Sequence, residues 1–205
     1  MENLLATPVT LALIAINVIL SLQGFNNRHY FENNLFWIGK IRREKEYHRF
    51  ITSAFLHVNG LHLFINMYVL YEFGNVLEQI LGPFGFALLY GVSLLGGNAW
   101  EYATKQNNPN YRAVGASGAT SGIILAFCLF FPFATLLLFF VIPMWSIVLA
   151  ALFIGGSYYL SQKPNTMIAH GAHLGGALAG LVIALILRPD AWGRLVDQVA
   201  QRFGG

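Results

Sequence analysis

The sequence predicts an all-α membrane protein that crosses the bilayer about six times. Of its 205 residues, 56% are hydrophobic and only 10% are charged, whereas about 25% are charged in an ordinary soluble domain. Six apolar segments approach the roughly 20 residues that a membrane helix needs. We therefore expect one polytopic domain over residues 1–205. We interpret its net charge of +3 as basic residues at the membrane surface. We therefore expect no nucleic acid as partner.

The first half of the chain contains three predicted spans. The first covers 7–22, with Pro8 in its opening turn, where a missing N–H costs least. A polar and aromatic loop follows, in which Phe36, Trp37, Ile38 and Ile41 stand among basic residues and suggest a segment at the lipid headgroups. The second span, 53–80, is interrupted by a turn-like Asn-Gly pair, and LGPFG leads into the third, 84–102.

No Asp, Glu, Lys or Arg occurs from Ala113 to Gln162, a stretch that suits two spans. Pro132 and Pro143 divide it, so we expect spans at 115–131 and 144–160, with an extended or re-entrant piece between them. The sixth span covers 168–187. The tail, 189–203, places its apolar residues on one helical face and predicts a short interfacial helix.

Polar residues inside the spans mark the candidate site, because they are costly in lipid and usually functional. His62 and Asn66 are spaced i, i+4 on one helix face, next to His57. Ser117 opens the fourth span, and His170 and His173 open the sixth. A serine in such a helix is more often packing than nucleophile, so the combination carries the argument.

Two stripes of glycine predict that the fourth and sixth spans touch. Gly118 and Gly122 form one small-xxx-small pair, and Gly176 and Gly180 form another; such pairs let helices approach closely in lipid. His173 lies on the second stripe. If the stripes face each other, Ser117 and His173 come within hydrogen-bond reach, as a base-activated nucleophile requires.

These motifs resemble those of rhomboid intramembrane serine proteases, of a bacterial type with a minimal six-helix core. The matching features, in the family's order, are HVNGLHLFIN with His62 and Asn66, GASG around Ser117, and His173 followed by Gly176 and Gly180. RFITSAFLHVNGLH from Arg49 and EFGNVLEQILG at 72–82 add support. The resemblance covers a core of about 49–187 and predicts a six-transmembrane-helix rhomboid-like bundle.

The resemblance implies a serine endopeptidase without cofactor or metal, in which Ser117 attacks and His173 is the general base. His62, Asn66 and the Ser117 backbone N–H would stabilise the oxyanion. The implied partners are membrane lipid and single-pass transmembrane proteins, which the enzyme cleaves in or near the membrane. The implied location is a cell's inner (cytoplasmic) membrane, crossed many times.

The chain departs from the family pattern at two positions. Ser121 stands where the family carries Tyr or Phe, four residues after the nucleophile, against the catalytic histidine. His48 precedes Arg49 where the family has Trp-Arg. Among the remaining polar residues, we interpret His170 as a local hydrogen-bonding residue, His57 as support for the first loop, and Glu72 and Glu78 as structural.

Orientation and activity stay open at this stage. Three Lys and Arg residues lie on the side of the termini and nine on the other, which by the positive-inside rule contradicts the family's cytoplasmic termini. Two alternatives to the protease are a catalytically inactive rhomboid-like protein that binds membrane proteins, and a small transporter that uses the histidines for protons or metal. The second lacks HExxH, Cys ligands and any Asp in a span.

Overall fold

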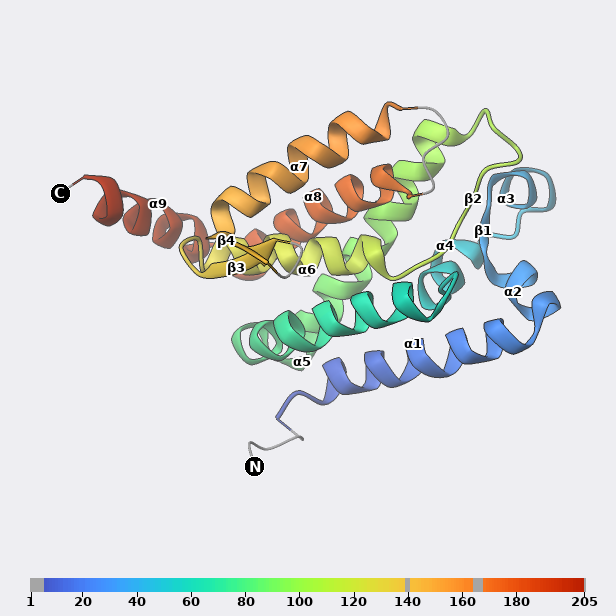
Figure 1. Cartoon of the computed structure of the whole chain (residues 1–205), viewed down its shortest axis with the longest axis horizontal. Coiled ribbons are helices and arrows are strands. Elements are labelled where there is room, and N and C mark those ends of the chain that lie inside the picture. The colour runs from blue at the N-terminus through green and yellow to red at the C-terminus, as the bar shows by residue number, and fades with distance from the viewer. Residues whose placement is uncertain (1–5, 139–140, 164–167, 205) are drawn as a thin grey trace.

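Long apolar helices run side by side through most of this molecule (Figure 1). The computed structural model describes residues 6–138, 141–163 and 168–204. The helices are α1 (Pro8–Asn26), α2 (Arg28–Asn34), α3 (Ile38–Glu44), α4 (Arg49–Thr52), α5 (Gly60–Lys105), α6 (Ser117–Phe130), α7 (Ser146–Ser161), α8 (His170–Leu187) and α9 (Asp190–Phe203), with a 3-10 turn at Ser53–Phe55. Two antiparallel strand pairs join β1 (Phe36–Trp37) to β2 (Arg112–Ala113), and β3 (Thr135–Leu138) to β4 (Ile142–Trp145).

The helical membrane bundle is confirmed, whereas the number of spans stays a prediction. Within the described ranges, α1, α5 and α8 are long and apolar enough to cross a membrane. Helix α5 contains two predicted spans, because the chain bends at Gly82 (φ 72°, ψ 165°) just before Pro83. Helices α6 and α7 are apolar but have only 14 and 16 residues.

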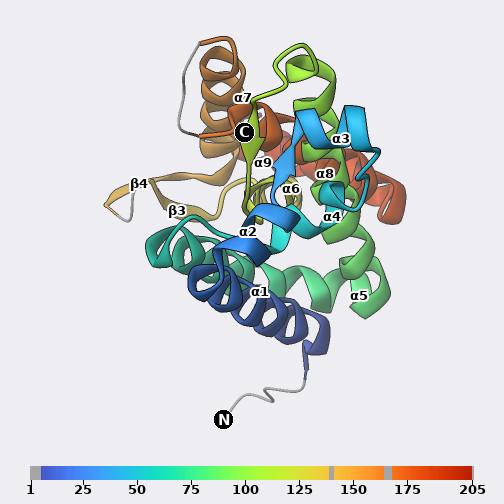
Figure 2. The ribbon, with the colours of Figure 1, turned by 90° about the vertical axis from the view of Figure 1, so that its right-hand side faces the viewer.

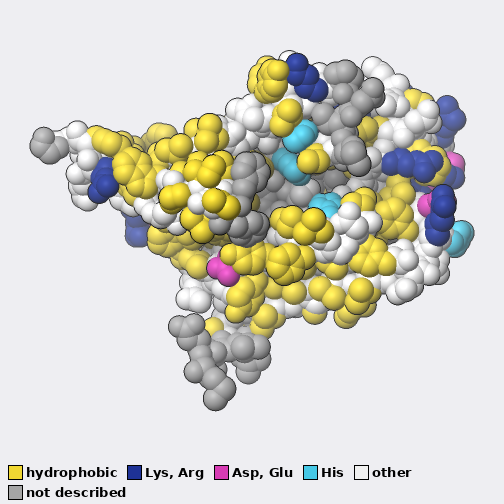
Figure 3. Space-filling view, in the orientation of Figure 1, with side chains coloured by type: hydrophobic (Ala, Val, Ile, Leu, Met, Phe, Trp, Pro, Cys, Tyr) yellow, Lys and Arg dark blue, Asp and Glu magenta, His cyan; other side chains and the backbone are white. Residues whose placement is uncertain are grey.

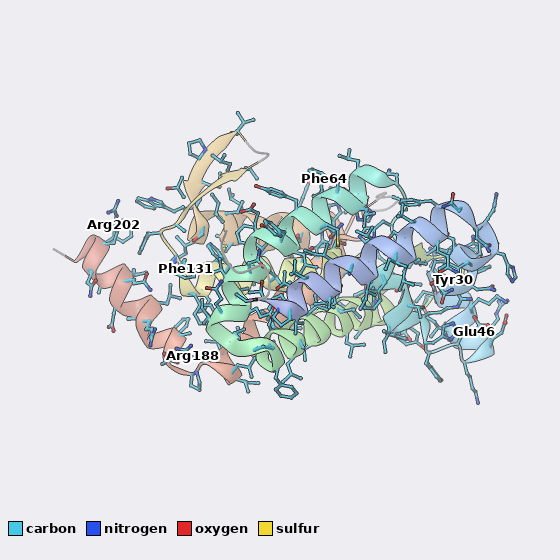
Figure 4. All side chains as sticks on the ribbon, turned by 90° about the horizontal axis from the view of Figure 1, so that it is seen from below. Tyr30, Glu46, Phe64, Phe131, Arg188 and Arg202 are labelled. Carbon is cyan, nitrogen blue, oxygen red and sulfur yellow. The ribbon has the colours of Figure 1, made fainter. Side chains whose placement is uncertain are left out.

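Side chains on the outside of the bundle are those that lipid would cover. Ile19, Phe64 and Ile186 are 63%, 63% and 65% exposed. Hydrophobic side chains cover much of the face in Figure 3, and most Lys and Arg side chains lie toward its two ends. Figure 4 shows Tyr30 and Glu46 at one end, with Arg188 and Arg202 at the other. This distribution fits a membrane belt between two polar ends.

The second span begins later than predicted. Residues 53–59 form the 3-10 turn and an extended segment, and the helix starts at Gly60. The Asn59 side chain accepts a hydrogen bond from the His62 N–H (2.8 Å) and caps the helix. The Asn-Gly pair is therefore an N-terminal signal and not an interruption, as the preference for Asn at N-caps explains.

The prediction that the apolar residues of the first loop lie in the headgroup region is wrong for three of the four. Phe36, Ile38 and Ile41 are 0% exposed and form a small core of their own, which packs against Phe50, Tyr102, Tyr111 and Ala113. Pairing of β1 with β2 folds the loop onto the end of α5. Protein surface thus replaces lipid around these side chains. Trp37, by contrast, is partly exposed, and the Arg112 guanidinium stacks on its ring, with Arg112 Cζ 3.8 Å from the ring centre.

Arg49 ties this loop together from inside. Its side chain is 3% exposed and pairs with Glu46 (2.6 Å), and it donates to the Glu32 and Leu35 carbonyls at 2.9 and 2.7 Å. A buried guanidinium needs such partners, since an unpaired one is costly. The neighbouring His48 contacts the Asn33 carbonyl at the loop surface (3.3 Å).

Helices α5, α6 and α8 form the centre of the bundle, and α6 lies inside it (Figure 2). Ten of its 14 residues are buried. A Cβ on Gly176 would overlap the Gly118 carbonyl, and one on Gly180 would overlap Gly122. The two predicted glycine stripes therefore do face each other, with backbone against backbone.

The remaining elements hold the ends of the bundle. Glu78, 1% exposed, accepts from the Val9 and Thr10 N–H groups (2.9 and 2.7 Å), so it secures the start of α1 against α5, a structural role. The extended piece predicted between the fourth and fifth spans is the β3–β4 hairpin, which projects from the side of the bundle (Figure 2). The predicted tail helix is α9, whose Phe203 packs against Trp145 of the hairpin.

Candidate active site

The four predicted site residues line one cavity of about 780 Å³. Ser117 comes from the start of α6, His62 and Asn66 from the first turns of α5, and His173 from the first turn of α8. The rest of the wall is mostly apolar. It also includes Arg28 and Glu32 of α2, and Tyr111 and Arg112 near β2. Histidine side chains reach the surface near the middle of the face drawn in Figure 3.

Ser117 is the first residue of α6 and presents a helix N-terminus to the cavity. Gly115, two residues earlier, has φ +130°, which residues with a Cβ rarely adopt. Its N–H donates to the Ser53 carbonyl (3.0 Å), and the Ala116 N–H donates to His57 Nε2 (3.4 Å). The backbone that leads into the helix is thus satisfied by protein. The Ser117 N–H has no intrahelical acceptor, as for every first-turn N–H, and no acceptor among the described residues either, so it can bind a ligand.

His57 supports the segment before Ser117. It is 0% exposed, and its Nδ1 lies 2.8 Å from the Ser21 hydroxyl, which donates to the Phe55 carbonyl. All three contacts are satisfied by an imidazole protonated on Nδ1, which donates to Ser21 and accepts from Ala116 through Nε2. The residue therefore connects α1, the first loop and the start of α6.

His62 lies across a small gap from Ser117. A Cβ on Gly115 would lie 2.6 Å from His62 Cε1, 3.0 Å from its Nε2 and 3.7 Å from Ser117 Oγ. Glycine at this position leaves that space open. The other ring nitrogen, Nδ1, is buried and has no partner within the described structure. His62 Nε2 and Ser117 Oγ thus border the same open space, where the imidazole can donate to an oxygen that forms there.

Asn66 is held by a residue that the sequence analysis missed. The Asn66 side chain is 4% exposed, its Oδ1 accepts from the Thr120 hydroxyl (3.0 Å), and its Nδ2 donates to the His62 carbonyl (2.9 Å). Thr120 thereby settles which end of the amide faces α6. An amide nitrogen carries two hydrogens, so one remains for the cavity. Thr120 follows Ser117 by three residues on the same helix, a spacing that could have signalled its role.

His173 lies between two aromatic rings. Phe153 of α7 stacks on it, with ring centres 6.1 Å apart and planes at 19°, and His170 meets it edge-on at 5.8 Å. In the described structure neither the Ser117 hydroxyl nor the His173 imidazole makes a hydrogen bond, so the two are not yet joined. The His170 ring likewise makes no side-chain hydrogen bond with a described residue, and the local hydrogen-bonding role expected of His170 stays a prediction.

Glu101 is a second residue that the sequence analysis missed. It is 1% exposed, and its Oε1 accepts from the Ala172 N–H (2.8 Å) in the first turn of α8. A carboxylate at a helix N-terminus is stabilising, and here it holds the turn that carries His173. The available signal was an acidic residue one position from the predicted end of a membrane span.

No group of three or more His, Cys, Asp or Glu side chains that could hold a metal ion occurs within residues 6–138, 141–163 and 168–204. The free cysteine, Cys128, is buried in α6, away from the cavity walls.

Comparison with known proteins finds a family that covers most of this chain. A family model described as the rhomboid domain matches residues 44–190. RHOMBOID-like protein 12, mitochondrial, of Arabidopsis thaliana is 29% identical over 95% of this chain and 60% of its own length. Rhomboid-like protein 11, chloroplastic, of the same plant is 29% identical over 77% of this chain and 61% of its own. Rhomboid protein 1, mitochondrial, of Saccharomyces cerevisiae is 33% identical over 64% of this chain and 39% of its own length.

This chain thus spans about 60% of the length of the two plant relatives. All three names place those relatives in organelles of eukaryotes. The comparisons therefore do not support the predicted bacterial origin.

Proposed function

This chain belongs to the rhomboid family of membrane proteins, and we propose that it is an intramembrane serine endopeptidase acting through Ser117 and His173. One observation carries the proposal: four residues from three separate helices converge on one cavity, with Ser117 at the N-terminus of a buried helix. A nucleophile, a base and oxyanion donors around a common space are what acyl transfer requires.

In the proposed reaction Ser117 Oγ attacks the carbonyl carbon of a substrate peptide bond while His173 takes the hydroxyl proton. The negative charge that develops on the carbonyl oxygen is stabilised by the Ser117 N–H, His62 and Asn66. The imidazolium then gives its proton to the leaving nitrogen as the C–N bond breaks. Water, activated by His173, hydrolyses the resulting ester and restores Ser117.

The first step requires a closer approach than this structure contains. Since no hydrogen bond joins Ser117 to His173, the hydroxyl must turn or α8 must shift when substrate binds. Catalytic hydrogen bonds often tighten only in the substrate complex. That adjustment can be small, because the glycines already bring the backbones of α6 and α8 into contact.

We assign single-pass transmembrane proteins as substrates, cleaved in or near the membrane. A transmembrane helix satisfies its carbonyls internally, so the scissile bond must be extended before attack. The cavity is mostly apolar yet reaches charged residues, Arg28 and Glu32 of the first loop and Arg112 of β2. Such a wall suits a segment leaving the bilayer. A multi-pass location in a cell's inner membrane rests on the family resemblance alone.

Purified protein in proteoliposomes, with a set of single-span model substrates, tests the proposal. The wild type should cleave, and Ser117→Ala and His173→Ala should not. A fluorophosphonate probe should label the wild type and not Ser117→Ala. Ser121→Ala, one turn along the same helix, is the matched control and should still label. Cleavage by Ser117→Ala would refute the mechanism. Binding without cleavage or labelling would favour the inactive rhomboid-like alternative.

A further inference from the structure

Position 121 carries serine where the family pattern has an aromatic ring against the catalytic histidine. The Ser121 side chain is 3% exposed, and its hydroxyl donates to the Ser117 carbonyl (2.6 Å). A short side chain committed to its own helix cannot cover an imidazole face. If His173 acts as a base, its ring must be held by another residue, since a proton acceptor works only in the correct orientation.

We propose that Phe153 of α7 is the residue that positions the His173 imidazole, so that the orientation of the base depends on how α7 is packed. This inference rests on the proposed function. The two rings are nearly parallel, at 19°, with centres 6.1 Å apart, within the range of offset-stacked aromatic pairs. His170 meets the same imidazole in a T-shaped contact at 80° and does not stack on it. Phe153 is therefore the ring that limits tilting of His173.

The helix that supplies Phe153 is weakly packed along its length. Only Ser146 and Ser157 of α7 are buried, and a Cβ on Gly155 or Gly156 would meet no atom within 4 Å. Backbone hydrogen bonds secure its beginning: the Ser146 N–H donates to the Ala134 carbonyl and the Ile147 N–H to the Pro132 carbonyl, both at 2.9 Å. Phe153, half-buried, is two turns beyond this anchor. A shift of the rest of α7 would therefore carry Phe153 off the imidazole.

Kinetics of matched variants test this role. Phe153→Ala should lower kcat about threefold to tenfold, the value of one aromatic contact, with little change in KM. The rate of fluorophosphonate labelling should fall in parallel. Phe153→Tyr should retain the wild-type kcat because it keeps the ring. Phe153→Leu, which lacks the ring, should show a lower kcat, as Phe153→Ala does. The control is Leu152→Ala, whose side chain is on the same helix and 54% exposed.

The inference would be overturned by an unchanged kcat in Phe153→Ala, or by an equal loss of kcat in Leu152→Ala. The inference would also be contradicted if a lower melting temperature explained the whole loss of kcat in Phe153→Ala and Phe153→Tyr did not restore kcat. A positioning role predicts instead that folded Phe153→Ala protein is slow.

A second measurement does not depend on catalysis. Diethylpyrocarbonate should modify His173 faster in Phe153→Ala than in wild type or Leu152→Ala, with the exposed His29 as internal reference in the same mass spectra. Equal rates would count against ring support by Phe153. If the wild type neither cleaves nor labels, the proposed function fails by itself, and the modification rates still decide whether Phe153 holds the ring.

Discussion

The carbonyl group of Gly118 lies directly against Gly176, so α6 and α8 meet through their backbones at the residues beside Ser117 and His173. This contact sets the separation of the proposed nucleophile and base. It requires glycine at position 176, because any Cβ there would occupy the space of the Gly118 carbonyl. Small residues at such crossings are how membrane helices pack without a hydrophobic driving force.

Gly176→Ala is expected to destabilise the protein by about 1–3 kcal/mol, the usual cost of overpacking, and to abolish cleavage by separating the two helices. Thermal unfolding in detergent and the proteoliposome assay measure the two effects. Gly91→Ala, where a Cβ would meet no atom within 4 Å, is the control and should be neutral or slightly stabilising. Equal behaviour of the two variants would refute the packing argument.

Thr120→Val should lower kcat about fivefold, the value of one ordinary hydrogen bond of about 1 kcal/mol, because the Asn66 amide loses the hydroxyl that orients it. Asn66→Ala should lower kcat about 100-fold or more, as the removal of an oxyanion donor does in other enzymes. Thr120→Ser keeps the hydroxyl and should retain activity. Full activity of Thr120→Val, measured under saturating substrate, would show that Asn66 needs no such support.

Glu101→Ala should destabilise the protein by about 1–3 kcal/mol, because the Ala172 N–H loses its buried acceptor. Cleavage should fall too, since His173 follows in the same turn. Glu101→Gln keeps an acceptor and should cost less. The exposed Glu72 supplies the control through Glu72→Ala. Unfolding midpoints that rank the two Ala variants equally would remove the capping role.

Stability in acid should depend on Glu46. Its hydrogen bond from Arg49 holds the pKa of Glu46 below the ordinary 4.5; the Arg49 charge acts in the same direction and burial opposes both. The pKa of Glu46 is lower in the folded than in the unfolded protein. The ionised carboxylate therefore stabilises the fold fully at pH values above the unfolded pKa, and this stabilisation is lost as the pH falls through the folded pKa. The melting temperatures of wild type and Glu46→Gln should therefore differ at about pH 7 and converge as the pH falls from 4.5 through the lower folded pKa. A constant difference would be inconsistent with this linkage.

Much of the site could be predicted because it depends on local sequence. His62 and Asn66 share a helix face by their spacing, and LGPFG ends one helix because Gly82 adopts a positive φ that Pro83 then follows. Glycine stripes predicted which helices touch. Thr120, Glu101 and Phe153 could not be ranked in the same way, because each acts on a residue of another helix. The local sequence can mark Thr120 and Glu101 as polar residues in spans, but it does not say which residue of the other helix each one contacts.

By itself, the sequence determined that this is a polytopic helical membrane protein, and it marked the residues of one candidate site. The physical reason is that apolar runs of this length have lipid as their only adequate solvent, and polar residues within them must be compensated. Tertiary structure decided the rest. It buried Phe36, Ile38 and Ile41 in protein where lipid was expected, started α5 at Gly60, and set Phe153 on His173. A local pattern cannot distinguish an apolar side chain that faces lipid from one that faces another helix, because both are equally hydrophobic; only packing does.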